Sequence, residues 1–148
     1  VTSPGRCEVV HRDPTVNLDA AHNPHGAKAL AQTLKSEFNF DEIVAVVGVF
    51  GDKDALGILQ ELEPIVDHVI VTQSSSSRAM SSSDLEKLAT SVFGNDRVFE
   101  VKDLHTALDR AVGDATRPLS EDTVGIIVTG SVVTVGEART YLRKKFAK

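Results

Sequence analysis

Acidic, imidazole and amide side chains crowd one short stretch of the sequence, LDAAHNPHG. Asp19 ends an apolar run, and His22, Asn23 and His25 follow before a helical pattern begins. An ordinary connection from a strand to a helix needs only a capping residue and a small residue. A carboxylate beside two imidazoles can also bind the hydroxyl, ammonium or carboxylate group of a ligand.

Part of this stretch has a purely structural interpretation. Asn23 followed by Pro24 predicts a helix start, because asparagine caps free N–H groups and proline has the φ of the first helical position. Asp19 and His22 remain unexplained, near a helix N-terminus that attracts anions. An acid there could hold a ribose hydroxyl or an ammonium group, and a histidine could hold a carboxylate. We expect His25 to face solvent.

Three further segments place polar residues beside expected strands. Lys53 follows the run EIVAVVGVF and lies between two aspartates. It belongs either to a simple turn with Asp54 as the helix cap, or to a site where it reaches an anionic ligand while restrained by the flanking carboxylates. Ser131 follows Gly130, and it is a helix cap, an anion-binding hydroxyl or both. Arg6, in the turn SPGR, precedes the first strand.

The elements that must position these residues alternate along the chain. Apolar runs that predict strands lie at 7–10, 15–18, 42–50, 68–72, 97–101 and 123–130. Helical spacing predicts helices at 27–38, 55–65, 85–92, 104–112 and about 133–146. This alternation predicts an α/β fold: a three-layer Rossmann-like sandwich with a mostly parallel sheet of about six strands and helices on both faces. Ligands of such sheets bind outside the carboxyl ends of the strands.

One serine-rich segment, SSSSRAMSSSDLEKL, joins an expected strand to an expected helix. Its composition is typical of a mobile surface loop, and Ser82 or Ser83 is expected to cap the helix. Arg78 and Met80 are the two residues of the segment that could have a further role.

Composition narrows the classes of function. The 148 residues suit one domain, and a net charge of −5 argues against a nucleic-acid partner. The single cysteine, Cys7, excludes an internal disulfide and a cysteine-based zinc site. No apolar run is long enough for a membrane span and no secretory signal is visible, so a cytoplasmic protein is expected. The missing initiator methionine hints at a fragment.

Four segments in this order resemble one enzyme family. PGRCEVV, LDAAHNPHGAKALAQTL, VVGVFGDKDALGILQEL and VTGSVVTVGEAR are similar to the C-terminal domain of folylpolyglutamate synthase, in the Mur-ligase-like group of ATP-dependent amide ligases. The resemblance runs from about Pro4 to Arg139. It implies one domain over residues 1–148. It also implies addition of L-glutamate to the γ-carboxylate of a folate through an acyl-phosphate, and some bacterial members also make dihydrofolate from dihydropteroate.

The resemblance assigns roles to the polar residues. Arg6 would bind the phosphates of ATP, and Asp19 would contact the nucleotide near its ribose or orient the site. His22 and Lys53, with Ser131 as a further candidate, would bind the incoming glutamate. Asn23 would remain a structural cap.

The resemblance also implies a partner that this chain does not contain. The family carries an N-terminal ATPase domain with a P-loop, which holds Mg²⁺, most of the ATP and the folate pocket. This chain has no such loop, so we expect no metal site in it. By itself it should be inactive and bind ATP or glutamate with a dissociation constant of about 1 mM or weaker. A peptidoglycan-precursor ligase domain and a non-catalytic α/β module are the alternatives.

Overall fold

The computed structural model describes residues 7–12, 14–116 and 123–147. The strands are β1 (Glu8–His11), β2 (Thr15–Asp19), β3 (Glu42–Val47), β4 (His68–Gln73), β5 (Val98–Asp103) and β6 (Val124–Thr129). The helices are α1 (Pro24–Glu37), α2 (Ala55–Leu62), α3 (Ser82–Phe93), α4 (Leu104–Ala115) and α5 (Val132–Lys145), with a 3₁₀ turn at Asn95–Arg97. Each expected strand and helix is present, within a few residues of its expected bounds.

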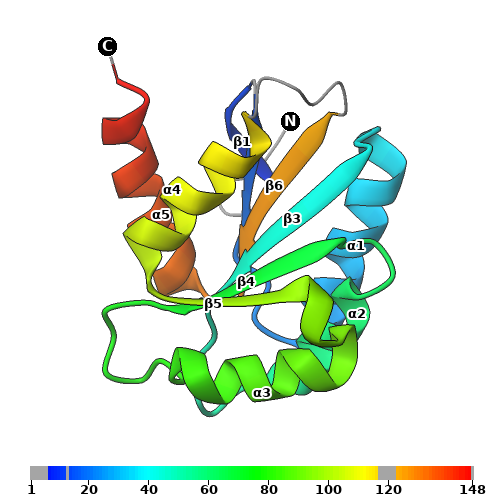
Figure 1. Cartoon of the computed structure of the whole chain (residues 1–148), viewed down its shortest axis with the longest axis vertical. Helices are drawn as coiled ribbons and strands as arrows, with labels where there is room; N and C mark the ends of the chain where they lie inside the picture. Colours follow the sequence, from blue (N-terminus) through cyan, green and yellow to red (C-terminus); the bar gives the residue numbers. More distant parts are fainter. Residues whose placement is uncertain (1–6, 13, 117–122, 148) are drawn as a thin grey trace.

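The strands form one sheet in the order β1-β2-β6-β3-β4-β5. Every neighbouring pair is parallel except β1 with β2. Helices α1, α2 and α3 cover one face of the sheet, and α4 and α5 cover the other (Figure 1). The predicted three-layer sandwich with a mostly parallel sheet is therefore confirmed.

The core consists of two apolar layers, one on each face of the sheet. Strand β6 shows how one strand serves both, because Ile127 packs beneath α1 to α3 while Ile126 and Val128 pack beneath α4 and α5. Burial on both faces explains why β3 and β6 read as continuous apolar runs in the sequence.

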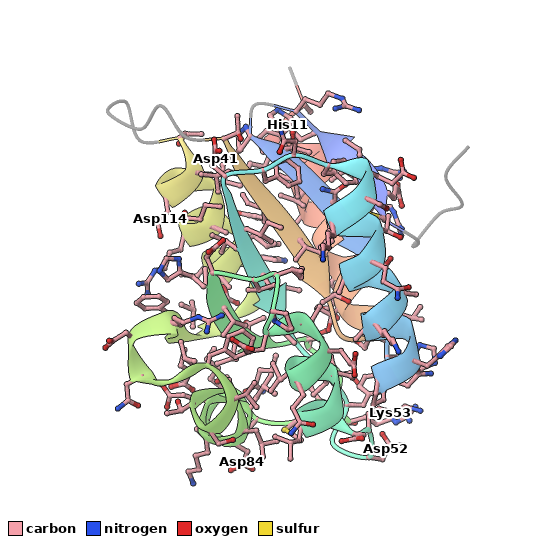
Figure 2. All side chains as sticks on the ribbon, turned by 90° about the vertical axis from the view of Figure 1, so that its right-hand side faces the viewer. His11, Asp41, Asp52, Lys53, Asp84 and Asp114 are labelled. Carbon is pink, nitrogen blue, oxygen red and sulfur yellow. The ribbon has the colours of Figure 1, made fainter. Side chains whose placement is uncertain are left out.

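One edge of the sheet collects all the helix starts. The five parallel strands end at this edge, which we call the carboxyl edge, and each is followed by a helix. Figure 2 shows Asp52 and Lys53 at this end of the molecule, opposite His11 and Asp41. Each of the five α-helices in the described part of the chain begins with a side-chain cap, and these caps are Asn23, Asp54, Ser81, Asp103 and Ser131.

The expected cap of α3 was wrong by one residue. Ser81, and neither Ser82 nor Ser83, accepts a hydrogen bond from the backbone N–H of Asp84, with an N–O distance of 3.2 Å. Ser82 is instead buried, and its hydroxyl donates to Glu100 on β5 at 2.6 Å. A run of identical serines leaves the first residue of the helix ambiguous in the sequence. In the structure, the hydrogen bond of Ser82 to β5 occupies Ser82 and leaves Ser81 as the cap.

Candidate active site

Asp19 holds the backbone at the carboxyl end of β2. Its Oδ1 accepts a hydrogen bond from the N–H of Ala21, and its Oδ2 accepts one from the N–H of Cys7, both at 2.9 Å. The carboxylate therefore ties the turn after β2 to the residue that follows Arg6. Both roles expected for Asp19, contact with the nucleotide and orientation of the site, stay predictions.

Cys7 enters β1 in an unusual conformation. Its φ of 48° lies in the left-handed region, where a side chain is strained, and its thiol is buried. Burial, together with the negative charges of Asp19 and Glu37, raises the pKa of the Cys7 thiol to about 11. Cys7 is thus a neutral packing residue. Arg6 lies outside the described residues.

In the turn after Asp19, one polar residue caps a helix and the two histidines are exposed. Asn23 caps α1 as predicted, because its Oδ1 accepts a hydrogen bond from the N–H of Gly26 at 2.7 Å. His22 is exposed, and its Nδ1 lies 3.1 Å from the carbonyl oxygen of Ala20. Since a carbonyl can only accept, Nδ1 donates there and Nε2 is turned away from this bond. His25 is also exposed, as expected.

Lys53 has no ionic partner among the described residues, although an aspartate lies on each side of it. Asp54 caps α2, with Oδ1 accepting from the N–H of Gly57 at 2.9 Å. Asp52 pairs with Arg78, with an N–O distance of 3.4 Å. The expectation that both flanking carboxylates restrain Lys53 is therefore wrong, because each is bound elsewhere.

The starts of α1 and α2 meet at one close contact. A Cβ built on Gly57 of α2 would lie 2.6 Å from the Cγ of Pro24, the first residue of α1. The missing side chain of Gly57 thus lets the turn that carries His22 approach the turn that carries Lys53. The start of α1 therefore packs directly against the first turn of α2.

Ser131 is a buried cap. Its hydroxyl accepts a hydrogen bond from the N–H of Thr134 at 3.0 Å and donates to the hydroxyl of Thr134 at 2.9 Å. With 2% of its surface exposed, Ser131 has a confirmed structural role, and its contact with glutamate stays a prediction. Thr134 in turn donates to the carbonyl of Gly48 at 2.9 Å, which joins the starts of α5 and of the loop after β3.

Gly130 lets the loops at the ends of β6 and β3 approach each other. Its φ is 119°, and a Cβ there would lie 2.3 Å from the carbonyl oxygen of Gly48. Its N–H donates to the carbonyl of Ala21, after β2, at 3.1 Å. The loops after β2, β6 and β3 are consequently joined through backbone groups.

A cavity of about 360 Å³ at the same edge was not foreseen. It opens at the carboxyl ends of β4 and β5, between residues 73–75 and 102–105, and Glu137 of α5 closes one side. Its carboxylates already accept hydrogen bonds, Asp103 from the N–H of Thr106 and Glu137 from Ser75. The sequence did contain one indication of this cavity, because Lys102 and Asp103 follow directly after an expected strand.

Two further observations concern metals and membranes. The described residues contain no group of three or more His, Cys, Asp or Glu side chains that could hold a metal ion. Within the same residues, no helix has the length and apolarity needed to cross a membrane.

The fold and the arrangement of this edge define a class of protein. Residues 5–132 match the model of the Mur ligase glutamate ligase domain, so the chain belongs to that family. Within it, the chain is 48% identical to the dihydrofolate synthase/folylpolyglutamate synthase of Mycobacterium tuberculosis, over 95% of this chain and 30% of that protein. It is 35% identical to the Escherichia coli enzyme of the same name, over 89% of this chain and 29% of that protein.

Solved structures agree with the sequence comparison. Folylpolyglutamate synthase from M. tuberculosis, in complex with ADP and AMPPCP, superposes with a TM-score of 0.87 at 48% identity and covers 100% of this chain. E. coli FolC in complex with DHPP and ADP gives a TM-score of 0.82 at 26% identity over 97% of this chain. The chain spans about a third of each, 33% and 32%, and corresponds to their C-terminal domain.

Proposed function

We propose that this chain is the C-terminal domain of an ATP-dependent folylpolyglutamate synthase and forms the part of its active site that faces the incoming glutamate. The reaction has two steps. The γ-phosphoryl group of ATP moves to the γ-carboxylate of a reduced folate, which gives ADP and an acyl-phosphate. The α-amine of glutamate then attacks the acyl carbon and displaces phosphate, so that an amide, inorganic phosphate and a proton are formed.

The residues of this chain bind and orient in that scheme. Lys53 supplies a cation for the carboxylates of glutamate, and His22 supplies a hydrogen-bond donor at Nε2 in the form that carries a proton on both ring nitrogens. Asp19 orients the backbone beside Arg6, the proposed phosphate ligand, and lies near the ribose. Asn23 fixes the first turn of α1. Ser131 acts first as the cap of α5 and is the least exposed of the proposed glutamate ligands.

One observation carries the proposal. The turn of His22 and the turn of Lys53 meet where Pro24 contacts Gly57, and the Lys53 ammonium group is not paired with either neighbouring aspartate. A dicarboxylate needs separate donors and cations within one small area, and this junction supplies both.

The ATPase domain, with its P-loop and its Mg²⁺ ligands, is proposed to lie elsewhere in a longer protein. ADP and AMPPCP in the M. tuberculosis structure, and ADP in the E. coli structure, support ATP as the co-substrate. Mg²⁺ would neutralise the charge that develops on the transferred phosphoryl group. This chain alone should neither hydrolyse ATP nor incorporate glutamate. A cytoplasmic location stays a prediction.

The test uses the full-length protein that carries this chain. It is given Mg-ATP, labelled glutamate and a reduced folate, and the label entering folate is followed together with ADP release. A second reaction replaces folate by dihydropteroate, because both bacterial relatives are named for both activities. We expect His22→Ala and Asp19→Ala to lower incorporation at least about tenfold, as expected for loss of hydrogen bonds to charged groups.

The matched control is His25→Ala, which removes a second exposed imidazole from the same turn. It should incorporate glutamate at the unmodified rate. Circular dichroism of each variant separates a loss of folding from a loss of activity. Normal incorporation by His22→Ala and Asp19→Ala would contradict the proposed roles. No incorporation into either pterin substrate by the unmodified protein would contradict the assignment to the folate ligases.

A further inference from the structure

The serine-rich segment after β4 is joined to the turn that carries Lys53. The N–H of Met80 donates to the carbonyl of Val49, and the N–H of Gly51 donates to the carbonyl of Arg78, both at 2.9 Å. Phe50 and Ala79 form an isolated antiparallel bridge between the same two segments. Around Arg78 the segment therefore lies against the end of β3, and the expected mobility of the segment stays a prediction.

Arg78 contacts the three residues that precede Lys53. Its guanidinium lies over the ring of Phe50, 4.4 Å from the centroid, and its carbonyl accepts from Gly51. Its Nη2 lies 3.4 Å from the Oδ2 of Asp52. Such an arrangement directs the carboxylate of Asp52 toward the loop of Arg78.

Asp52 is the acid that could otherwise pair with Lys53. Its neighbour Asp54 is already bound to the N–H of Gly57 as the cap of α2. Asp52 has no such backbone commitment in the described residues, and Figure 2 shows it next to Lys53 at the carboxyl edge. Without Arg78, its carboxylate would lose its ionic partner and would be free to pair with the Lys53 ammonium group.

We propose that Arg78 is a positioning residue that holds Asp52 away from Lys53 and so keeps Lys53 available to a carboxylate of the incoming glutamate. This inference rests on the proposed function, in which Lys53 binds glutamate. Arg78 acts through charge and stacking on the turn and has no contact with substrate in this role. The backbone bonds between the two segments do not depend on its side chain, so its substitution should leave the loop in place.

The test measures initial rates of the full-length protein against glutamate concentration, with ATP and folate saturating. Arg78→Ala should raise the KM for glutamate about 1.5- to fivefold, the range set by one competing exposed ion pair. The kcat and the KM for ATP should stay within about twofold, because neither depends on how Lys53 is paired. Adding Asp52→Asn to Arg78→Ala should restore the KM for glutamate, since the competing charge is then gone.

Arg110→Ala is the matched control. Arg110 also stacks on an aromatic ring, Phe99, at 4.7 Å, and also pairs with an aspartate, Asp114, at 4.0 Å, but it lies on α4. Its loss should leave the KM for glutamate unchanged. Lys53→Ala gives the reference value, and Arg78→Ala should add nothing in that background.

The outcomes separate the two proposals. If Lys53→Ala raises the KM for glutamate but Arg78→Ala does not, this inference is wrong and the role of Lys53 stands. If Asp52→Asn fails to restore the Arg78→Ala variant, or if the effects of Arg78→Ala and Lys53→Ala multiply, Arg78 binds substrate directly and the inference is again wrong. A normal KM in Lys53→Ala overturns both the role of Lys53 and this inference.

Discussion

Replacing Gly57 by alanine tests the contact that brings the two turns of the site together. The added Cβ would lie 2.6 Å from the Cγ of Pro24 and 2.5 Å from the Oδ2 of Asp54. The proline ring is rigid and starts α1, whereas the aspartate is the cap of α2. To make room for the Cβ, either the starts of α1 and α2 must move apart or Asp54 must lose its hydrogen bond as the cap of α2.

The magnitude follows from three contributions. Overpacking at a tight contact costs about 1–3 kcal/mol, and loss of an N-cap costs about 1 kcal/mol. Alanine in a helix gains about 0.5–1 kcal/mol over glycine, which offsets part of this. We therefore expect Gly57→Ala to lower the free energy of unfolding by about 2 kcal/mol, with Tm about 4–8 °C lower for a domain of this size.

Thermal and urea unfolding provide the assay, and Gly136→Ala is the control. Gly136 lies within α5 with no atom near its missing Cβ, so alanine there should raise the free energy of unfolding by about 0.5–1 kcal/mol. In a Pro24→Ala background, Gly57→Ala should cost less, because one of its two clashes is removed. Equal stabilisation by Gly57→Ala and Gly136→Ala would refute the contact between the two turns.

Two side chains allow simple spectroscopic and chemical tests. Burial raises the pKa of Cys7 from 9.0 to about 11, so at pH 8 a thiol reagent should react about 100-fold more slowly with the folded chain than with urea-unfolded chain; equal rates would contradict the buried, neutral thiol. Tyr141, the single tyrosine of the chain, donates a hydrogen bond to Asp109 at 2.6 Å, and this bond raises its pKa above 10.0. This hydrogen bond stabilises the folded chain at pH values below the pKa of tyrosine in the unfolded chain, and the stabilisation is lost as the pH rises through the raised pKa of Tyr141 in the folded chain. Asp109→Asn should therefore lower the midpoint pH of the Tyr141 absorbance titration. An unchanged midpoint would exclude the bond as the cause of the raised pKa.

Local rules explain what the sequence could predict. Asn23 and Asp54 were recognised as caps because a helix start depends on a few consecutive residues, and both caps are confirmed. The strands were recognisable because burial on both faces demands continuous apolar runs. The same runs predicted the three layers, since strands alternating with helices pack in few ways.

Contacts between distant residues could not be read from the sequence. Nothing in the residues around Gly57 reveals that Pro24 occupies the space of its missing side chain. Arg78 and Asp52 are 26 residues apart, so their pairing depends on how the loops after β3 and β4 pack. The prediction that Asp52 and Asp54 restrain Lys53 was wrong for the same reason, because the actual partner of Asp52 is distant in the sequence.

The charges at the helix starts explain why the end of β2 suits an anionic ligand in a chain with 21 acidic and 16 basic residues. Four of the five helices have no acid in their first turn, and only α1 and α5 of these also have an uncharged cap, Asn23 and Ser131. These two helices follow the neighbouring strands β2 and β6 but leave toward opposite faces of the sheet. Open α/β sheets bind ligands where successive helices leave toward opposite faces, and here the two helix starts without an acid follow β2 and β6, with Asp19 at the end of β2. The acids at the other starts, Asp54, Asp84 and Asp103, belong to helices that follow β3, β4 and β5. The helix dipoles should therefore favour an anion most at the β2–β6 end, against the single negative charge of Asp19, and the phosphates of ATP and a carboxylate of glutamate are proposed to bind there.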